Sequence, residues 1–280
     1  MIDRLDPQEL RNRLYNDKYW SKKDLGQHFL IDGRVLEAML EAAELSESDT
    51  VVEVGPGMGV LTEKLLEQAG HVVAFEYDFQ MVKILQDDFK NEKLELVAGD
   101  VLQTAVEKIP TIGAYKVVAN IPYQITTPLI KLFLEGGVSV LPERLVLLVQ
   151  KEVGERLTAG PSESGRGFLS MLTQYYSDAE YVVTVPRASF WPIPGVDSAV
   201  ISLHIKQERR YTGEDESNFL RYVKRAWTQP RKQLKNVLAG MRGVAHTEIG
   251  AQFIALGLPE NIRVQELNED QWDVLYRGNV

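Results

Sequence analysis

The chain has 280 residues, of which 44% are hydrophobic and 25% charged, a composition that suits a soluble protein with one large domain or a large domain and an appendage. It contains no cysteine and four histidines, which excludes disulfides, thiolate ligands and cysteine nucleophiles and disfavours a zinc site, so we expect no bound metal. The formal net charge of -9 argues on average against a nucleic-acid partner, because phosphate binding needs clustered Lys and Arg.

Residues 1–24 form a polar N-terminal extension. This stretch is charged throughout and lacks the apolar core of a signal peptide, and no apolar run in the chain approaches the length of a membrane span. We therefore expect a cytoplasmic protein with no membrane partner. The pattern does not assign the extension a structure or a role.

From residue 33 onward, short β-branched strands alternate with amphipathic helices. This alternation predicts an α/β domain whose parallel sheet is covered by helices on both faces. Two late strands have no convincing helix between them, which predicts that the sheet ends in an antiparallel pair. The expected strands are 49–55, 71–78, 94–100, 115–123, 143–150, 179–186 and 198–205, and the expected helices are 33–45, 59–70, 79–89 and 126–137.

After about residue 207 the strands stop and four short helices follow, at 216–227, 231–241, 246–257 and 268–278. We expect a small all-helical domain over 207–280, attached to an α/β domain over 25–206. Between Asn218 and Gly243 the chain carries seven basic residues and no acidic one. Such a run is ordinarily a solvated helix face, but in an acidic protein it favours contact with RNA phosphates. The residues are Arg221, Lys224, Arg225, Arg231, Lys232, Lys235 and Arg242.

A nucleotide-type site is indicated at the ends of three successive strands. Gly55, Gly57 and Gly59 stand at a strand-to-helix turn, where small residues let a ligand approach the backbone. Glu76 ends the second strand at the spacing where a carboxylate binds ribose hydroxyls, and Asp100 ends the third. A merely tight turn and a helix cap at Asp100 are the alternatives. NAD and S-adenosylmethionine sites share this geometry.

The fourth strand, 115–123, ends in Asn120, Ile121, Pro122 and Tyr123 at the same edge of the sheet. A turn with a packed tyrosine is the simple interpretation. Beside a methyl-donor site, however, the Asn120 amide oxygen and the Ile121 carbonyl could hold the protons of an adenine amine, with Pro122 fixing the backbone. Tyr123 would stack on the base, which must be extruded from structured nucleic acid.

Together, these stretches resemble the ribosomal RNA adenine dimethyltransferases. The resemblance covers residues 25 to about 240. It is carried by "LGQHFLID" (25–32), "VVEVGPGMGVLTEKL" (51–65), "NIPYQITTPLI" (120–130), "LVQKEVGERLTAGPSESGRGFLSMLTQYY" (148–176) and "FWPIPGVDSAVISL" (190–203).

The resemblance implies a Rossmann-like, S-adenosylmethionine-dependent methyltransferase domain with a helical RNA-binding domain. The implied reaction dimethylates two adjacent adenines near the 3' end of small-subunit (16S) rRNA within a pre-ribosomal particle, during ribosome biogenesis, and a monomer is expected. Catalysis is implied for Asn120 to Tyr123, with Phe190 as a second aromatic sandwiching the base. Donor contacts are implied for Gln27, His28, Leu30, Gly55, Gly57, Glu76, Asp100 and Asn120.

Three positions depart from the family pattern. The family usually has Asn where His28 stands, often has lysine at the position of Gly195, and has arginine at the position of Pro230. The last two changes remove expected RNA contacts. Two alternatives stay open: a large-subunit rRNA methyltransferase of the erythromycin-resistance type, and a non-catalytic assembly or transcription factor derived from the family.

Overall fold

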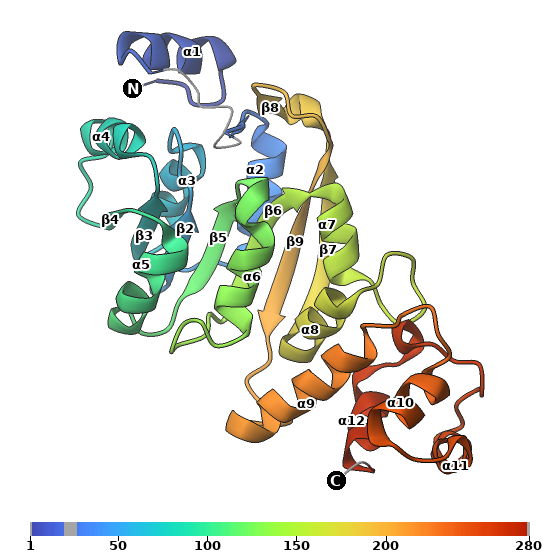
Figure 1. The fold of residues 1–280 in the computed structure, drawn as a ribbon. Helices are drawn as coiled ribbons and strands as arrows, with labels where there is room; N and C mark the ends of the chain where they lie inside the picture. The colour runs from blue at the N-terminus through green and yellow to red at the C-terminus, as the bar shows by residue number, and fades with distance from the viewer. Residues whose placement is uncertain (1, 20–26, 279–280) are drawn as a thin grey trace. The chain divides into compact units, whose positions relative to one another are not determined.

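A computed structural model describes residues 2–19 and 27–278 (Figure 1). The chain forms two compact units, one made of Met1–Gly154 and Ala179–Ile205, the other of Glu155–Asp178 and Lys206–Val280. The sequence pattern assigns 155–178 to the first domain, whereas here it groups with the C-terminal helices. The reason is side-chain packing: the rings of Tyr175 and Phe219 lie 5.4 Å apart.

The first unit is built on a seven-stranded sheet with the order β4-β3-β2-β5-β6-β9-β7. Neighbours among β2 to β6 are parallel, whereas β9 runs antiparallel to β6. The two late strands expected to end the sheet as an antiparallel pair, β9 and β7, are neighbours at its edge. The strands are rich in Val, Leu and Ile because both faces are covered. They are β2 (Thr50–Val54), β3 (His71–Glu76), β4 (Leu94–Ala98), β5 (Lys116–Asn120), β6 (Arg144–Gln150), β7 (Ser177–Val185) and β9 (Ser198–Ile205).

Helices cover both faces of this sheet, with α2 and α3 packed on one face and α5 and α6 on the other (Figure 1). Several begin at an aspartate whose side chain accepts from a backbone N–H of the first turn, the role of an N-cap: Asp32, Asp78 and Asp100. The helices are α2 (Gly33–Ala43), α3 (Val60–Gln68), α4 (Phe79–Asp88), α5 (Val101–Lys108) and α6 (Thr126–Leu134), with 3-10 turns at Ile109–Thr111, Tyr123–Ile125 and Arg187–Ser189.

Two short pieces of chain far apart in sequence form a second, two-stranded sheet. β1 (Phe29–Leu30) pairs antiparallel with β8 (Phe190–Trp191), placing Phe29 opposite Trp191 and Leu30 opposite Phe190. This ladder brings the "GQHFLID" segment beside the "FWPIP" segment. Ahead of them, α1 (Pro7–Asn16) is capped by Asp6. The part of the proposed extension at 20–24 lies outside the described residues.

The second unit is helical and its core is aromatic. The rings of Tyr175, Tyr211, Phe219 and Tyr276 contact one another with centroids 5.2 to 5.6 Å apart. The four C-terminal helices expected from sequence are confirmed, joined by α8 from the middle of the chain. They are α8 (Phe168–Tyr176), α9 (Gly213–Ala226), α10 (Leu234–Arg242), α11 (His246–Ala255) and α12 (Glu269–Arg277), with a 3-10 turn at Val264–Glu266, and α7 (Lys151–Thr158) crosses the unit boundary.

Over the described parts of the chain, the structure contains no helix that combines the length and apolar character needed to cross a bilayer.

Candidate functional site

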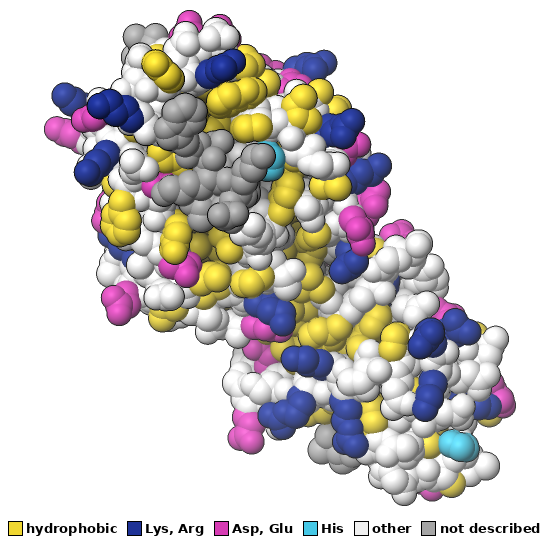
Figure 2. All heavy atoms as spheres, turned by 45° about the horizontal axis from the view of Figure 1, so that its top comes forward, with side chains coloured by type: hydrophobic (Ala, Val, Ile, Leu, Met, Phe, Trp, Pro, Cys, Tyr) yellow, Lys and Arg dark blue, Asp and Glu magenta, His cyan; other side chains and the backbone are white. Residues whose placement is uncertain are grey.

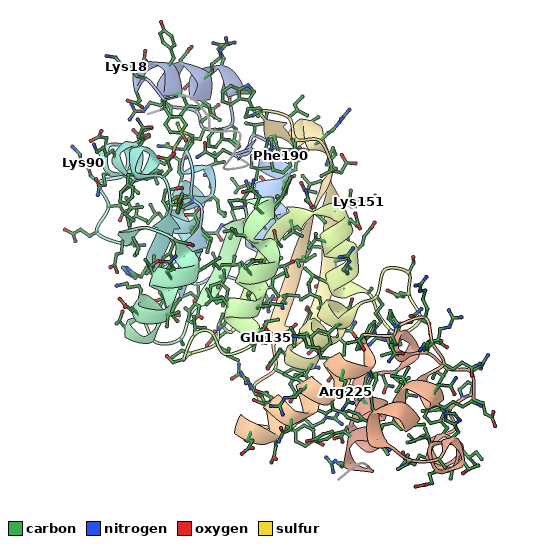
Figure 3. All side chains as sticks on the ribbon, in the orientation of Figure 1. Lys18, Lys90, Glu135, Lys151, Phe190 and Arg225 are labelled. Atoms are coloured by element: carbon green, nitrogen blue, oxygen red, sulfur yellow. The ribbon has the colours of Figure 1, made fainter. Side chains whose placement is uncertain are left out.

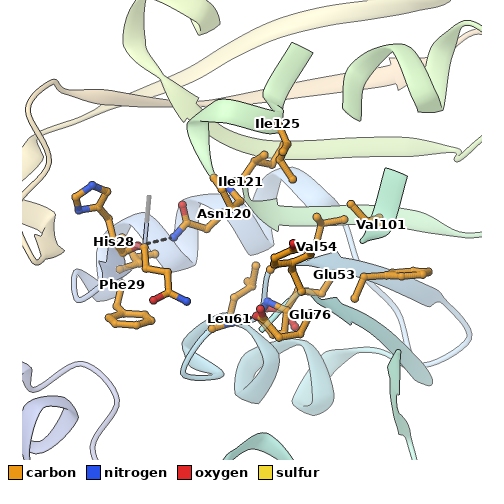
Figure 4. Close-up of a pocket in the computed structure, with 18 of the residues that line it drawn as sticks. His28, Phe29, Glu53, Val54, Leu61, Glu76, Val101, Asn120, Ile121 and Ile125 are labelled. Atoms are coloured by element: carbon orange, nitrogen blue, oxygen red, sulfur yellow. Dashed lines mark hydrogen bonds between the residues drawn. The ribbon is translucent and has the colours of Figure 1, made fainter. Parts of the chain in front are cut away.

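A cavity of about 350 Å³ opens at the carboxyl ends of β2, β3, β4 and β5 (Figure 4). Parallel strands end at one edge of a sheet, which is where ligands bind in such folds. The cavity brings together every residue that we expected to contact a cofactor and the whole expected catalytic tetrapeptide. These residues are Gln27, His28, Leu30, Gly55, Gly57, Glu76, Asp100, Asn120, Ile121, Pro122 and Tyr123.

The glycine loop between β2 and α3 needs its glycines. Gly55, Gly57 and Gly59 have φ values of 71°, 56° and 78°, a left-handed conformation that side chains with a Cβ disfavour. A Cβ on Gly59 would also lie 2.4 Å from the ring of Phe89. The loop therefore keeps its backbone open to the cavity and points the N-terminus of α3 at it.

Glu76 is the buried carboxylate of this site. It is 6% exposed, and it accepts hydrogen bonds from the backbone N–H of Gly57 at 3.1 Å and of Asp78 at 2.8 Å. Burial raises the pKa of Glu76, and these two bonds oppose that shift. A carboxylate has about four acceptor positions, so Glu76 keeps the capacity to accept from ligand hydroxyls.

Asp100 is both a helix cap and a lining residue of the cavity, the two roles that its sequence position allowed. Its Oδ1 accepts from the backbone N–H of Leu102 at 3.0 Å, which caps α5. The residue also lines the cavity. Because a carboxylate has a second oxygen, capping leaves Asp100 able to accept from a ligand.

Sequence reasoning missed Glu53, which lines the same cavity from β2. Its side chain is 1% exposed and accepts from the Thr62 hydroxyl at 2.7 Å. Burial raises the pKa of Glu53 to about 8, so the carboxyl is mainly neutral at pH 7. A glutamate inside a valine run was the available signal, because a buried charge inside a strand needs a reason.

We expect Glu53→Gln to flatten the pH dependence of stability. The folded chain holds this proton up to a pKa of about 8, whereas an unfolded Glu releases it near pH 4. The stabilisation from the bound proton is therefore complete below the pKa that Glu53 has in the unfolded chain, and it is lost as pH rises through the pKa that Glu53 has in the folded chain. Between these two values the free energy of unfolding falls by at most about 1.4 kcal/mol per pH unit. Urea unfolding at about pH 5 and about pH 8 measures this. A wild-type curve parallel to the variant's would contradict it, and exposed Glu47→Gln is the control.

The Asn120–Tyr123 segment is held by contacts from two other parts of the chain. The Asn120 Nδ2 donates to the His28 carbonyl at 3.2 Å, which leaves the amide oxygen as the acceptor. The Tyr123 hydroxyl bonds the Ser198 hydroxyl at 2.8 Å, and its ring stacks on that of His28 with centroids 6.1 Å apart. The His28 Nδ1 lies 2.7 Å from the Pro192 carbonyl, so it donates that bond.

Ser198 is a second residue that sequence reasoning missed. It is fully buried at the start of β9, 75 positions after Tyr123. Its hydroxyl fixes the rotation of the Tyr123 ring, which makes the ring a preset surface. No local pattern could have paired the two residues, because only the sheet brings them together.

Phe190 does not lie at the cavity, contrary to the expectation that it sandwiches a target base. The residue is 1% exposed and belongs to a core cluster with Leu30, Leu36 and Val200. Figure 3 labels its position on β8. In a strand, neighbouring side chains point to opposite faces, and here the outer position falls to Trp191, whose ring stacks on Phe29.

The expected RNA-binding residues lie in and between α9 and α10 of the second unit. Arg221, Lys224, Arg225, Arg231 and Lys232 are exposed, and Arg225 is labelled on α9 in Figure 3. Figure 2 shows Lys and Arg side chains gathered on this part of the surface. Lys235 differs, because it pairs with Glu260 at 2.7 Å. The basic stretch between Asn218 and Gly243 contains no acidic residue, but a carboxylate from outside the stretch therefore neutralises the positive charge of Lys235.

Comparisons with known proteins agree on the kind of protein that this chain resembles. A family model described as ribosomal RNA adenine dimethylase matches residues 20–276. A relative from Clostridioides difficile, named ribosomal RNA small subunit methyltransferase A, is 38% identical over 266 residues, which cover 93% of this chain and 91% of the relative.

Two solved structures share the fold over most of the chain. One is a dimethyladenosine transferase from Plasmodium falciparum, with a TM-score of 0.75 and 24% identity, covering 89% of this chain and 98% of that one. The other is the 23S rRNA methyltransferase ErmE, with a TM-score of 0.74, 26% identity and the same coverage.

Proposed function

Since this chain belongs to the ribosomal RNA adenine dimethylase family, we propose that it dimethylates the exocyclic amines of two adjacent adenines near the 3' end of small-subunit rRNA. S-adenosylmethionine is the methyl donor. The observation that carries this proposal is one cavity lined by the glycine loop, Glu76 and Asp100 together with Asn120 to Tyr123. Donor-binding and amine-binding residues thus share a single space.

The residues of the cavity fit the proposed donor. The glycine loop leaves room for close approach to the backbone, and Glu76 can accept from a ribose diol. The Asp100 Oδ2 accepts one long bond, from the Gln103 Nε2 at 3.5 Å, and can also accept from an amine. The volume of about 350 Å³ lies within the range of small-molecule sites. When bound, S-adenosylmethionine supplies an electrophilic methyl group on a sulfonium.

Asn120 and Ile121 prepare the attacking amine. An adenine amine is a poor nucleophile because its lone pair is conjugated into the ring. When the two N–H groups of the amine donate hydrogen bonds to the Asn120 amide oxygen and the Ile121 carbonyl, the nitrogen favours a pyramidal geometry. Its lone pair then points at the methyl group. Positive charge develops on this nitrogen during transfer, so fixed carbonyl dipoles stabilise the transition state without a strong base.

Tyr123 provides the stacking surface for the extruded base. Its ring is held from two sides, by the Ser198 hydroxyl and by the His28 ring, so stacking costs little further ordering. The electron-rich face of the ring also lies where the amine gains positive charge, which is favourable. His28 occupies the position where the family usually has Asn, and in this role it supports Tyr123.

Small-subunit rRNA is favoured over large-subunit rRNA as the substrate. The relatives at 36% to 40% identity carry the small-subunit name, whereas the large-subunit enzyme ErmE is 26% identical. We infer a pre-ribosomal particle as the acceptor, with the enzyme acting in the cytoplasm as a monomer. A non-catalytic descendant of the family would have no need of the complete donor and amine sites.

The test is incubation of the protein with undermodified small subunits and isotopically labelled S-adenosylmethionine, followed by mass spectrometry of the rRNA. We expect label on two adjacent adenines near the 3' end, with two methyl groups on each. Label found only on large-subunit RNA would support the erythromycin-resistance type instead. RNA binding without label would support a non-catalytic factor.

We also propose that the exposed basic residues of α9 and of the segment between α9 and α10 contact RNA phosphates. Reversing the charge of Arg231 and Lys232 should weaken RNA binding and lower the salt slope of log Kd by about one for each lost phosphate contact. Filter binding over a salt series measures both quantities. Reversal of Lys83 and Lys90, which are exposed on the first unit, is the matched control. Unchanged affinity and slope in the Arg231 and Lys232 variant would disprove the assignment.

A further inference from the structure

We propose that residues 2–19, here called the N-terminal segment, contribute to binding of the methyl donor. In this segment Tyr19 positions Gln27 and Glu76. This inference rests on the proposed function, since it concerns the same donor. The family model begins only at residue 20, so the segment lies outside the family match. The structure nevertheless builds it into the wall of the donor cavity at three places.

The first attachment joins the segment to the glycine loop. The Arg4 side chain is 4% exposed, and its Nε donates to the Met58 carbonyl, within that loop, at 2.9 Å. The guanidinium pairs with Asp88 at 3.0 Å and with Glu63 at 3.4 Å. It also lies 4.4 Å from the centroid of the Phe89 ring, the ring that leaves no room for a side chain at Gly59. The buried Arg4 guanidinium, paired with two carboxylates, therefore holds the glycine loop in place from the side of the N-terminal segment.

The second attachment is apolar. Leu10 and Leu14 of α1 are 0% and 4% exposed and pack in one cluster with Phe29, Met58 and Met81. Residues four apart lie on one face of a helix, so α1 covers this cluster with a single stripe. Phe29 and Met58 also line the donor cavity. The helix is thus directly behind the cavity wall.

The third attachment reaches the polar groups of the site. The Tyr19 side chain is 3% exposed, and its hydroxyl lies 2.6 Å from the Gln27 Oε1 and 2.9 Å from the Asp78 Oδ2. One hydroxyl proton serves one acceptor, and the carboxylate is the stronger acceptor. The Tyr19 hydroxyl therefore donates to the Asp78 carboxylate or to the Gln27 amide oxygen, and it lies within hydrogen-bond distance of both.

From Asp78 the network continues to the ribose-binding carboxylate. The Asp78 backbone N–H donates to the Glu76 Oε1, and the Glu76 Oε2 accepts from the Gly57 N–H. Burial raises the pKa of Tyr19, so its hydroxyl keeps its proton over the ordinary pH range. Tyr19 thereby orients Gln27 and Glu76, both of which line the cavity. It acts through these residues as a positioning residue and is not itself catalytic.

The test is titration calorimetry of the full chain with S-adenosylmethionine and with S-adenosylhomocysteine, without RNA. Tyr19→Phe removes one oxygen atom and should weaken binding of both ligands about tenfold, the effect of losing a hydrogen bond to a charged group. Tyr15→Phe, in the same N-terminal segment but at a residue that is 72% exposed, is the matched control and should bind as the wild type does. In turnover, the donor KM should rise while the RNA KM stays the same.

A double-mutant cycle separates positioning from a general loss of stability. If Tyr19 acts through Gln27, then Tyr19→Phe in a Gln27→Ala background should weaken donor binding by clearly less than it does alone. Equal donor affinity of Tyr19→Phe and the wild type, with or without a lower Tm, would overturn the inference and leave the proposed function standing. Strict additivity in the cycle would also overturn it. A wild type that binds neither ligand would overturn both.

Discussion

Replacing Asn120 by alanine is expected to abolish methyl transfer while S-adenosylmethionine binding largely survives. Because the Asn120 Nδ2 donates to the His28 carbonyl, the amide oxygen is the acceptor that we assign to the substrate amine, and alanine removes it. Loss of one preorganised transition-state contact typically lowers kcat by about 10²- to 10³-fold. Most donor contacts come from elsewhere in the cavity, so the donor Kd should change little.

Single-turnover methylation of undermodified small subunits measures the first effect, and calorimetry with the donor measures the second. Asn91→Ala, at an exposed position between α4 and β4, provides the control. Wild-type turnover by Asn120→Ala would refute the role of the amide. A parallel loss of donor binding would instead make Asn120 chiefly a donor contact.

Replacing Glu76 by alanine should have the opposite signature, with donor binding lost and RNA affinity kept. Hydrogen bonds to a charged group contribute about 1.5–3 kcal/mol each, so losing two from a ribose diol should raise the donor Kd by at least about 100-fold. The change also frees the N–H groups of Gly57 and Asp78 that the carboxylate now holds.

Calorimetry with S-adenosylmethionine checks this prediction, and RNA filter binding shows whether the variant is folded. Glu95→Ala is the control, because Glu95 lies on β4 and pairs with Lys108 at 2.7 Å. Burial raises the pKa of Glu76, so wild-type donor affinity should fall as pH is lowered through that pKa. Donor affinity within twofold of the wild type in Glu76→Ala would disprove the ribose role.

The α/β character of the chain could be predicted because its strands are continuous runs of valine and leucine between glycine-marked turns. Four helices, α1, α5, α7 and α8, are not among the predicted ones. α5, "VLQTAVEK", and α7, "KEVGERLT", are each only eight residues long. α8, "FLSMLTQYY", buries six of its nine residues, among them Ser170 and Thr173, so polarity does not mark its buried face. Its aromatic partners are supplied by α9 and α12, which lie far along the chain.

The donor and amine sites could also be predicted, since each of their residues follows a strand and parallel strands end together. What could not be predicted depends on contacts between distant segments. Tyr19 meets Asp78 across 59 positions and Tyr123 meets Ser198 across 75. The buried placement of the Phe190 ring could not be predicted either, because a motif gives the residue type but not the side of a two-residue strand on which the side chain lies.

The charge of the donor cavity has a consequence for product release. The described residues that line it include three with carboxyl groups, Glu53, Glu76 and Asp100, and none that is Lys or Arg. Glu53 is mainly neutral at pH 7 because its pKa is raised to about 8, but Glu76 and Asp100 still make the cavity favour a cationic ligand over a neutral one. A sulfonium donor carries a positive charge that its thioether product lacks. The cavity should therefore hold the spent molecule less tightly than the fresh one, which eases exchange between the successive transfers that each adenine requires.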